Sequence, residues 1–353
     1  MTVLYRTYRP QKWSDVIGQD HIVSVLKSAI ASKHVAHAFL FSGSRGTGKT
    51  SVARILAKSL GTAEEDIYEI DAASNRGIDD IRHLREHVSV LSFSSPYKVY
   101  IIDEVHMLSK DAWNALLKTL EEPPTHVIFI LATTELNKVP ETIISRCQTF
   151  SFKKPSRDVI RAHSIMIAKE EGYTLDPGAA DLIALLGDGS FRDALGTLEK
   201  VIASAGNESG AKSSATIKNS VAKKITRGEV ETITGAPKAE LVNSFIENLI
   251  AKNADLAIKT LGEVEQASLL ISTFTTLVLE KMRFIFLLQN SFSSKDYIKD
   301  RVSEDDWTFI STQADKKGVS ASMLSALLEA ADKIGRSQIE SLPLELAVLE
   351  MVK

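Results

Sequence analysis

The sequence predicts an α/β domain followed by all-α domains, and three observations lead to this fold class. Over residues 1–154, short apolar runs alternate with helical patterns, as expected for a parallel sheet covered by helices. A glycine-rich loop directly follows the first apolar run. Over residues 156–204 and again over 229–353, apolar residues recur every three or four positions, which is the period of an amphipathic helix.

We expect four segments along the chain, divided where the composition changes. Lys153-Lys154-Pro155 marks the end of the α/β domain, because proline disfavours helix in the residue before it. A later stretch rich in Ser, Gly, Ala and Lys indicates a flexible linker. The expected segments are the α/β domain at 1–154, a small helical domain at 155–204, the linker at 205–228 and a helical domain at 229–353.

Composition indicates a globular protein and excludes several other classes. The 353 residues are too many for one typical domain, and 44% of them are hydrophobic. The single cysteine, Cys147, excludes a disulfide framework and a four-cysteine zinc site. No stretch is apolar enough over sufficient length to span a bilayer, and the N-terminus lacks the apolar core of a signal peptide. We therefore expect a cytoplasmic protein without a membrane partner.

The most specific motif is a complete G-x-x-x-x-G-K-[ST] phosphate loop at residues 43–50, between an expected strand at 38–41 and an expected helix at 51–57. Its glycines let successive backbone N–H groups face the phosphates of a nucleotide. Lys49 adds a full positive charge, and the Thr50 hydroxyl can hold Mg²⁺. The nucleotide-binding residues expected here are Gly43, Ser44, Arg45, Gly46, Thr47, Gly48, Lys49, Thr50 and Ser51.

Two carboxylates follow a second apolar run, Val99-Tyr100-Ile101-Ile102. Ligands of parallel sheets bind at the carboxyl ends of the strands, so Asp103 and Glu104 are expected near Lys49. Asp103 is suited to Mg²⁺, and Glu104 to the role of a general base that polarises water. Alternatively, the two acids only cap the helix expected at 111–121.

A third apolar run, at 126–132, ends in Thr133-Thr134. A hydroxyl at this strand end can orient the attacking water or sense the terminal phosphate of a nucleotide. The alternative is that threonine occurs here only because β-branched residues suit strands.

Small polar and basic residues at two expected helix starts suit the phosphates of DNA without reading its sequence. They are Ser74, Asn75, Arg76 and Lys110. The alternative is that they are ordinary solvated side chains. The net charge of −3 does not exclude DNA binding, because a local basic stripe is sufficient.

The phosphate loop, the Asp-Glu strand and the polar strand end, in this order, resemble the AAA+ ATPases. Further stretches resemble clamp loaders, and together they resemble the gamma/tau family of bacterial DNA polymerase III subunits, densely over residues 1–200. These stretches are Tyr8-Arg9-Pro10 with Val16-Ile17-Gly18-Gln19, Asp71-Ala72-Ala73-Ser74-Asn75-Arg76-Gly77, Leu116-Leu117-Lys118-Thr119-Leu120-Glu121-Glu122-Pro123-Pro124, and Ser145-Arg146-Cys147.

The resemblance implies a fold and a set of residue roles. The fold would be an AAA+ sheet domain, a helical lid and a C-terminal helical collar. Arg146 would be an arginine finger that reaches a neighbouring subunit, Thr134 a first sensor and Arg192 a second sensor. Without the family, the two arginines would be read as surface ion-pairing residues. The adenine would be framed by Tyr8, Arg9, Pro10, Val16 and Ile17.

The resemblance also implies an activity and partners. The chain would be the ATP-hydrolysing motor subunit of a clamp loader, with ATP and Mg²⁺ as cofactors and Lys49, Glu104, Thr134 and Arg146 as catalytic residues. Its partners would be delta-type and delta-prime-type subunits, further copies of itself, the sliding clamp and primer–template DNA. The stretch Val88 to Tyr97, with Phe93 and Pro96 exposed, is our candidate for the clamp-facing loop.

One departure from the family keeps alternatives open. Family members usually carry a four-cysteine zinc module before the Asp-Ala-Ala-Ser stretch, and this chain has only Gly61 to Asp66 in that interval. We therefore expect no zinc. The alternatives are a small subunit of a non-bacterial clamp loader, a AAA+ stator that hydrolyses nothing, and a hexameric AAA+ helicase or remodeller.

Overall fold

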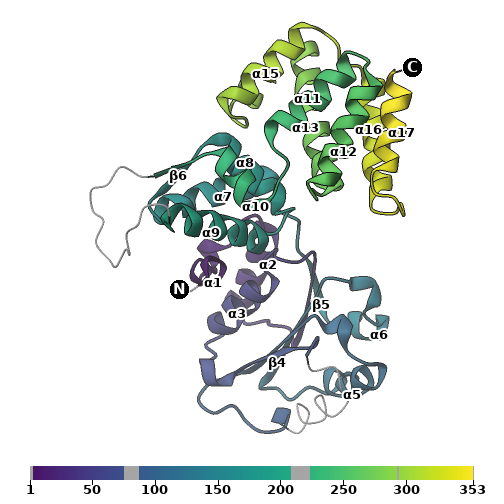
Figure 1. Ribbon diagram of the computed structural model, residues 1–353. Helices are drawn as coiled ribbons and strands as arrows, with labels where there is room; N and C mark the ends of the chain where they lie inside the picture. Colours follow the sequence, from purple (N-terminus) through teal and green to yellow (C-terminus); the bar gives the residue numbers. More distant parts are fainter. Residues whose placement is uncertain (1–2, 75–86, 208–222, 292–293, 353) are drawn as a thin grey trace. The chain divides into compact units, whose positions relative to one another are not determined.

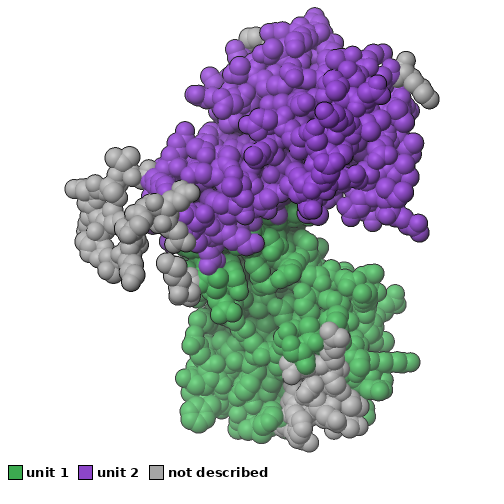
Figure 2. Space-filling view, viewed as in Figure 1, with its two compact units in different colours: residues 1–160, 187–196 green, residues 161–186, 197–353 purple. Residues whose placement is uncertain are grey.

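The computed structural model describes residues 3–74, 87–207, 223–291 and 294–352 (Figure 1). The chain forms two compact units, shown in different colours in Figure 2. Unit 1 comprises residues 1–160 and 187–196, and unit 2 comprises residues 161–186 and 197–353. Among the described residues, no helix combines the length and the apolar character needed to cross a membrane.

Unit 1 is built on a five-stranded parallel sheet. The strand order is β2-β3-β4-β1-β5, and each neighbouring pair is parallel. The strands are β1 (Ala38–Ser42), β2 (Ile67–Asp71), β3 (Lys98–Asp103), β4 (Val127–Thr133) and β5 (Gln148–Ser151). Central position explains the near-continuous apolar sequences of β1, β3 and β4, because such strands are buried on both faces.

Alternate residues of these strands face two separate helical layers. On one face, strand residues such as Leu40 and Phe129 pack with Trp113 and Leu116 of α5 (Lys110–Glu121). On the other face, strand residues such as Phe41 and Ile130 pack with α2 (Asp20–Ala31) and α3 (Lys49–Ser59). The expected α/β domain with helices on both faces of a parallel sheet is therefore confirmed.

Short helical turns connect these elements and complete unit 1. They are α1 (Leu4–Thr7), η1 (Trp13–Asp15), η2 (Glu64–Asp66), η3 (Val105–Met107), η4 (Leu136–Lys138) and α6 (Glu141–Ile144). The loop at 187–190 and the first six residues of α9 (Phe191–Asn207) also belong to this unit. The carboxyl ends of β1, β3 and β4 lie at one edge of the sheet, which is where the predicted site residues are concentrated.

Unit 2 begins with helices and a small sheet, and the first residues of two of these helices, α7 and α9, fall within unit 1. The elements are α7 (Arg157–Glu170), β6 (Tyr173–Leu175), α8 (Pro177–Leu186), α9 (Phe191–Asn207), β7 (Lys223–Ile225) and α10 (Arg227–Thr234). Strands β6 and β7 pair in parallel, with Thr174 opposite Lys224. The sequence pattern indicated helices alone over 156–204, so this strand pair was missed.

Regular structure also occupies both ends of the range 205–228, which we predicted as a linker. Helix α9 continues to Asn207, and β7 begins at Lys223 because it finds a pairing partner in β6. Thr226 then caps α10, with its hydroxyl accepting from the Glu229 backbone N–H. Residues 208–222 lie outside the described residues, and a linker there stays a prediction, as do the other domain boundaries.

The rest of unit 2 is helical, as predicted for the C-terminal segment. Its helices are α11 (Ala239–Ile250), α12 (Ala254–Gln266), α13 (Ile271–Asn290), α14 (Ser294–Lys299), α15 (Glu304–Asp315), α16 (Ala321–Ile334) and α17 (Leu342–Val352). Phe245 and Leu249 of the predicted apolar stripe are buried, and Phe245 packs edge-on against Phe274 of α13. Most of that stripe thus forms an intramolecular core.

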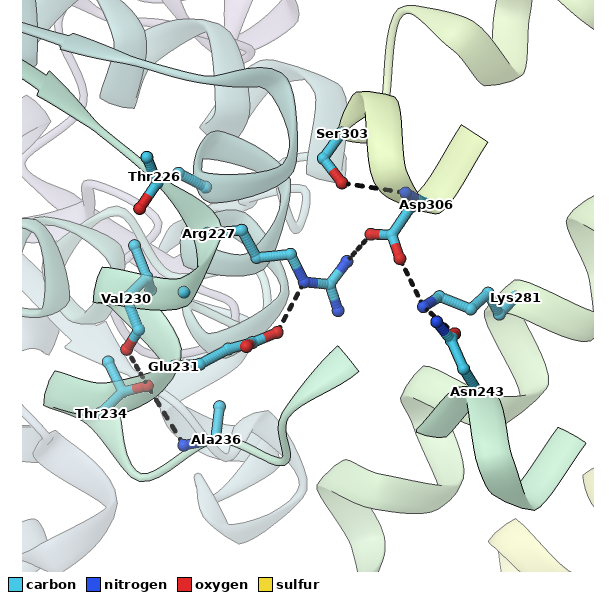
Figure 3. Close-up of polar contacts among 12 residues, drawn as sticks. Thr226, Arg227, Val230, Glu231, Thr234, Ala236, Asn243, Lys281, Ser303 and Asp306 are labelled. Atoms are coloured by element: carbon cyan, nitrogen blue, oxygen red, sulfur yellow. Dashed lines mark hydrogen bonds and ion pairs between the residues drawn. The ribbon is translucent and has the colours of Figure 1, made fainter. Parts of the chain in front are cut away.

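A network of buried charges joins α10 to the later helices of unit 2 (Figure 3). Arg227 pairs with Glu231 at 2.8 Å and with Asp306 at 2.5 Å. Asp306 also pairs with Lys281 at 2.5 Å, and Lys281 donates to the Asn243 amide oxygen at 2.6 Å. Burial acts to raise the pKa of Asp306, but the charges of Arg227 and Lys281 outweigh it and lower the pKa.

Candidate functional site

The glycine-rich loop joins the end of β1 to the start of α3. Gly43, Gly46 and Gly48 adopt positive φ angles of 145°, 73° and 100°. A Cβ atom at Gly43 would lie 2.7 Å from the Phe152 carbonyl oxygen, so this position requires glycine. Gly48 is the N-cap of α3, and a Cβ atom there would meet nothing within 4 Å. The loop therefore curls in front of a helix N-terminus, where N–H groups and the helix dipole favour an anion.

Lys49 lies in this loop with its ammonium group folded back onto the backbone. Nζ donates to the carbonyl oxygens of Gly43 at 2.7 Å and Ser44 at 2.9 Å. Burial lowers the pKa of Lys49, and the charges of Glu104 and Asp103 partly offset this effect. Since both hydrogen-bond partners are neutral, the charge of Lys49 is available to a phosphate group.

The remaining loop residues divide into buried and exposed ones. Thr47 is 2% exposed, and its hydroxyl donates to the Ser44 carbonyl at 2.9 Å, which fixes the curl of the loop. The Arg45 side chain is exposed. Ser51, in the first turn of α3, accepts a hydrogen bond from Arg9 Nε at 3.1 Å.

Asp103 and Glu104 lie beside the loop at the carboxyl end of β3. The Thr50 hydroxyl donates to Asp103 Oδ2 at 2.7 Å, so the two predicted Mg²⁺ ligands are in direct contact. Glu104 has a positive φ of 49° and lies close enough to Lys49 to influence its pKa. The cap of α5 is Ser109, whose hydroxyl accepts from Ala112 N, so the alternative in which the two acids cap this helix is wrong.

Thr134 follows β4 and contacts the Glu104 carboxylate. Its hydroxyl donates to Glu104 Oε2 at 2.9 Å, and its backbone N–H donates to the same oxygen at 3.3 Å. Adjacent strands thus bring the predicted base and the predicted first sensor together. The Thr133 carbonyl oxygen instead accepts from the Gly43 backbone N–H at 3.2 Å, which ties β4 to the phosphate loop.

The N-terminal segment lies on the α3 side of the sheet. Arg9 is the residue that reaches the loop region, through Ser51, and burial lowers its pKa. Val16 packs against the apolar core beneath α3, whereas Ile17 is 37% exposed. Tyr8 is the C-cap of α1, and it and the following Pro10 are partly exposed. A role for these residues in framing adenine stays a prediction.

Arg192 occupies the first turn of α9 and is held near the loop by its neighbours. The Phe191 backbone N–H donates to the Gly46 carbonyl at 3.2 Å. The Arg192 guanidinium lies 5.7 Å from the centroid of the Tyr5 ring, within range of a cation–π contact. Its charge contributes to the lowered pKa values of Arg9 and Lys49, after burial and nearer charges. Three cations therefore converge on the mouth of the phosphate loop.

Arg146 follows α6 and forms an ion pair at the surface, as expected for this residue when the family resemblance is left aside. Nη2 lies 2.7 Å from Glu121 Oε1, and Nη1 donates to the Thr142 carbonyl at 2.7 Å. The Arg146 side chain is 34% exposed. The pair lies at the surface, and a role of Arg146 in a neighbouring subunit stays a prediction.

Only part of the predicted DNA surface can be placed. Ser74 donates its hydroxyl to Asp71 Oδ2 at 3.0 Å, and Lys110 is an exposed residue at the start of α5. Asn75 and Arg76 lie outside the described residues. A DNA contact by these four residues stays a prediction.

The single cysteine is not a reactive thiol in this structure. Cys147 packs against the apolar core beside α5, and burial raises its pKa to about 11. Within the described parts of the chain, no group of three or more His, Cys, Asp and Glu side chains is arranged to hold a metal ion.

Two residues near the site were missed from the sequence. His106 lies in η3 against Glu104, and Tyr5 lies beneath Arg192. His106 stands directly after the Asp-Glu-Val stretch, and this position was the one available signal for it. Nothing in the local pattern of the N-terminus distinguishes Tyr5 from other aromatic residues of the chain.

Comparison with known proteins finds similarity to subunits of bacterial DNA polymerase III. A family model described as DNA polymerase III, delta subunit, matches residues 18–76 and 63–156. The DNA polymerase III subunit tau of Bacillus subtilis is 42% identical over 284 residues, which cover 74% of this chain and 48% of that protein. The subunit tau of Escherichia coli is 44% identical over 223 residues, which cover 57% of this chain and 35% of that protein.

A third relative extends the match, and a solved structure supports the fold. The gamma/tau subunit of Mycobacterium tuberculosis is 34% identical over 310 residues, which cover 81% of this chain and 51% of that protein. This chain thus spans about half or less of the length of these relatives. The Thermotoga maritima RuvB Holliday junction branch migration motor aligns with a TM-score of 0.53 at 20% identity, covering 69% of this chain and 79% of that one. At this identity the likeness shows the AAA+ fold alone.

Proposed function

Because this chain is a homologue of the bacterial DNA polymerase III gamma/tau subunits over most of its length, we propose that it is the ATP-driven motor subunit of a clamp loader. The observation that supports the proposal best is the joint placement of an intact phosphate loop, the Thr50–Asp103 contact and a carboxylate at Glu104 on one sheet edge. A stator that only binds partners has no need to keep these three features together.

The residues present fit a nucleoside triphosphate with Mg²⁺. Lys49, Arg9 and Arg192 supply positive charge around the loop, and their described contacts are to neutral groups. A Mg²⁺ ion held by Thr50 and Asp103 would offset the negative charge of the phosphates. The helix dipole of α3 and the loop N–H groups add to the same effect. The adenine would lie against the segment that contains Tyr8 and Ile17.

Hydrolysis needs a water activated beside the terminal phosphate. Glu104 accepts a proton from that water, the water oxygen bonds to the γ-phosphorus, and the bond to the ADP oxygen breaks. Thr134, which already donates to Glu104, orients the base and responds to the γ-phosphate. Arg146 leaves Glu121 and enters the site of a neighbouring subunit when the complex is assembled.

The proposed partners follow from the family and from two exposed surfaces. Phe93 is 88% exposed and Leu91 is 74% exposed, on a loop fixed by hydrogen bonds from Phe93 N and Ser94 N to the buried Asp66 carboxylate. We assign this loop to the sliding clamp. Lys110 and the stretch that begins at Ser74 would contact the DNA backbone without reading sequence. Delta-type and delta-prime-type subunits and copies of this chain would complete the ring, and the complex would act in the cytoplasm.

Steady-state ATP hydrolysis tests the proposal directly. The chain is assayed with sliding clamp, primed DNA and the delta-type partners, and each component is omitted in turn. We expect strong stimulation that requires both the clamp and primed DNA. Nucleotide binding without turnover under all conditions would favour a stator. Stimulation by DNA alone, in a homo-hexamer by native mass, would favour a helicase.

A further inference from the structure

His106 occupies a position between two carboxylates that the proposed mechanism does not use. Its Nδ1 atom lies 3.4 Å from Glu104 Oε2 and 3.1 Å from the Thr133 hydroxyl oxygen. Its Nε2 atom lies 3.4 Å from Glu135 Oε1. Nδ1 thus forms its hydrogen bond with the Thr133 hydroxyl and makes a longer contact with the proposed base, while Nε2 faces the loop after β4. Both carboxylate contacts are ion pairs only in the imidazolium form of the ring, in which both nitrogens donate.

The burial of this ring distinguishes it from the other polar groups around it. The His106 side chain is 7% exposed, whereas Glu104 is 29% exposed and Glu135 is 41% exposed. A side chain that only fills space needs no nitrogen atoms aimed at carboxylates, and a buried ring with unpaired nitrogens would be costly. The contacts, rather than the volume alone, account for a histidine at this position.

The far side of the ring is anchored to the surface of unit 1. Glu135 pairs with Lys138 at 2.8 Å, and its backbone N–H donates to the Thr133 hydroxyl at 3.0 Å. The hydrogen bond from Lys138 lowers the pKa of Glu135, and the nearby His106 acts in the same direction. Glu135 is thus held as a carboxylate that fixes Nε2, so the ring has little freedom to turn.

The near side of the ring acts on one oxygen atom of Glu104. Oε2 also accepts from the Thr134 hydroxyl and backbone N–H, so His106 adds a third polar neighbour to this atom. With Oε2 held from the β4 side, the orientation of the carboxylate toward the Lys49 side of the site is fixed. A general base must be held in position to accept a proton from water efficiently.

We propose that His106 is a positioning residue for ATP hydrolysis, which fixes the Glu104 carboxylate through Nδ1 while Glu135 fixes the ring through Nε2. This inference rests on the proposed function. It concerns the hydrolysis step and not the binding of ATP, because the described contacts of His106 lie on the β4 side of Glu104 and include none with the phosphate loop.

Two substitutions separate this role from simple packing. His106→Asn places an amide nitrogen near the position of Nδ1, and His106→Gln places one near the position of Nε2. We expect His106→Asn to keep turnover near the wild-type value. We expect His106→Gln and His106→Ala to lower kcat about tenfold, the cost of one lost orienting contact to a charged group. The control is His34→Asn, an exposed histidine away from the site, which should change nothing.

The measurements are kcat in the assembled complex, the Kd for Mg·ATP and the midpoint of urea unfolding. The Kd should stay within about twofold of the wild-type value in all variants, since the phosphate loop is untouched. Equal kcat values for the Asn and Gln variants, or a better Gln variant, would show that the ring only fills space and would overturn the inference. A wild-type chain without any turnover would overturn the proposed function, and the role of His106 with it.

Discussion

The phosphate-loop site of unit 1 and the buried ion network of unit 2 both contain several positively charged side chains. The two regions differ in the groups that contact these charges. In the loop site, Lys49 donates to backbone carbonyls, Arg9 to a serine hydroxyl, and Arg192 lies over an aromatic ring. In the network, Arg227 and Lys281 each pair directly with a carboxylate at 2.5 Å.

The acids of the two regions show the same contrast. Asp103 accepts from the Thr50 hydroxyl and Glu104 from Thr134, so both have neutral hydrogen-bond donors. Asp306 is held between two cations and is 1% exposed. Charges with neutral partners remain available to a charged ligand, whereas mutually paired buried charges are already neutralised. The first arrangement suits binding and the second suits the folded structure of unit 2.

The largest effect should come from Lys49→Ala, which removes the central cation of the loop site. The loss of two charge-assisted contacts to phosphate should weaken Mg·ATP binding by roughly 10³-fold. Urea unfolding should be little changed, because Lys49 has only carbonyl partners in the described structure. The control is Lys58→Ala on the same helix, where the side chain is 44% exposed. Unchanged ATP affinity in Lys49→Ala would show that the site is misassigned.

Arg146→Ala should lower the rate of ATP hydrolysis by a similar factor, but only when the chain is assembled with neighbouring subunits. An arginine finger contributes about 10³-fold or more to the rate in systems where it has been measured. We expect that loss in the assembled complex, with ATP affinity nearly intact. Lys27→Ala, an exposed residue on α2, serves as a surface-charge control. If the isolated chain is slowed as much as the complex, Arg146 does not act in a neighbouring subunit.

Asp306→Asn should break the paired region instead. Two buried cations would lose their shared carboxylate, which typically costs about 3–5 kcal/mol of stability. The matched control is Asp332→Asn, whose i,i+4 pair with Arg336 is exposed and should contribute less than about 0.5 kcal/mol. Urea unfolding of both variants measures the difference. A loss in ATP affinity with no loss in stability would reverse the roles that we give to the two regions.

Lowering the pH should reduce the stability that the Asp306 network contributes, and this effect should be smaller than that of the substitution at neutral pH. The cations around Asp306 hold its pKa below the ordinary value of 3.8, so the unfolded chain takes up this proton first as the pH falls. The stability that Asp306 contributes is complete above about pH 4 and is lost at lower pH. The difference in unfolding free energy between wild type and Asp306→Asn should therefore narrow as the pH falls below about 4. A constant difference would contradict the lowered pKa.

Tyr5→Ala should give the smallest effect, because it removes the aromatic support of Arg192. An exposed cation–π contact contributes about 0.5–1 kcal/mol, so Mg·ATP affinity should fall about two- to fivefold. Tyr5→Phe keeps the ring and should bind as the wild type does. Equal losses in both variants would point to the hydroxyl group instead of the ring.

Local sequence pattern was sufficient for the loop site because its parts are each encoded in one short stretch. The glycines at 43, 46 and 48 fix the loop, and the apolar runs of β1, β3 and β4 identify buried parallel strands. Parallel strands then place Asp103 and Thr134 at the same edge of the sheet. The AAA+ fold and these neighbours therefore followed from the sequence.

Pairings between distant segments could not be read in this way. Strand β6 pairs with β7 across the stretch 176–222, and Arg227 meets Asp306 from a helix far along the chain. Neither segment carries a local sign of its partner, because tertiary packing decides which polar groups are buried together. The contact of Arg146 with Glu121 and the two-sided placement of His106 escaped the sequence for the same reason.

The measurement that tests the central claim most directly is a calorimetric titration of the chain with Mg·ATP. The cations of the loop site have neutral partners, whereas those around Asp306 are paired with carboxylates, so we predict one bound nucleotide per chain. The heat of binding should be abolished in Lys49→Ala and retained in a folded Asp332→Asn control. Binding that persists in Lys49→Ala, or no binding to the wild type, would contradict the assignment of the loop site.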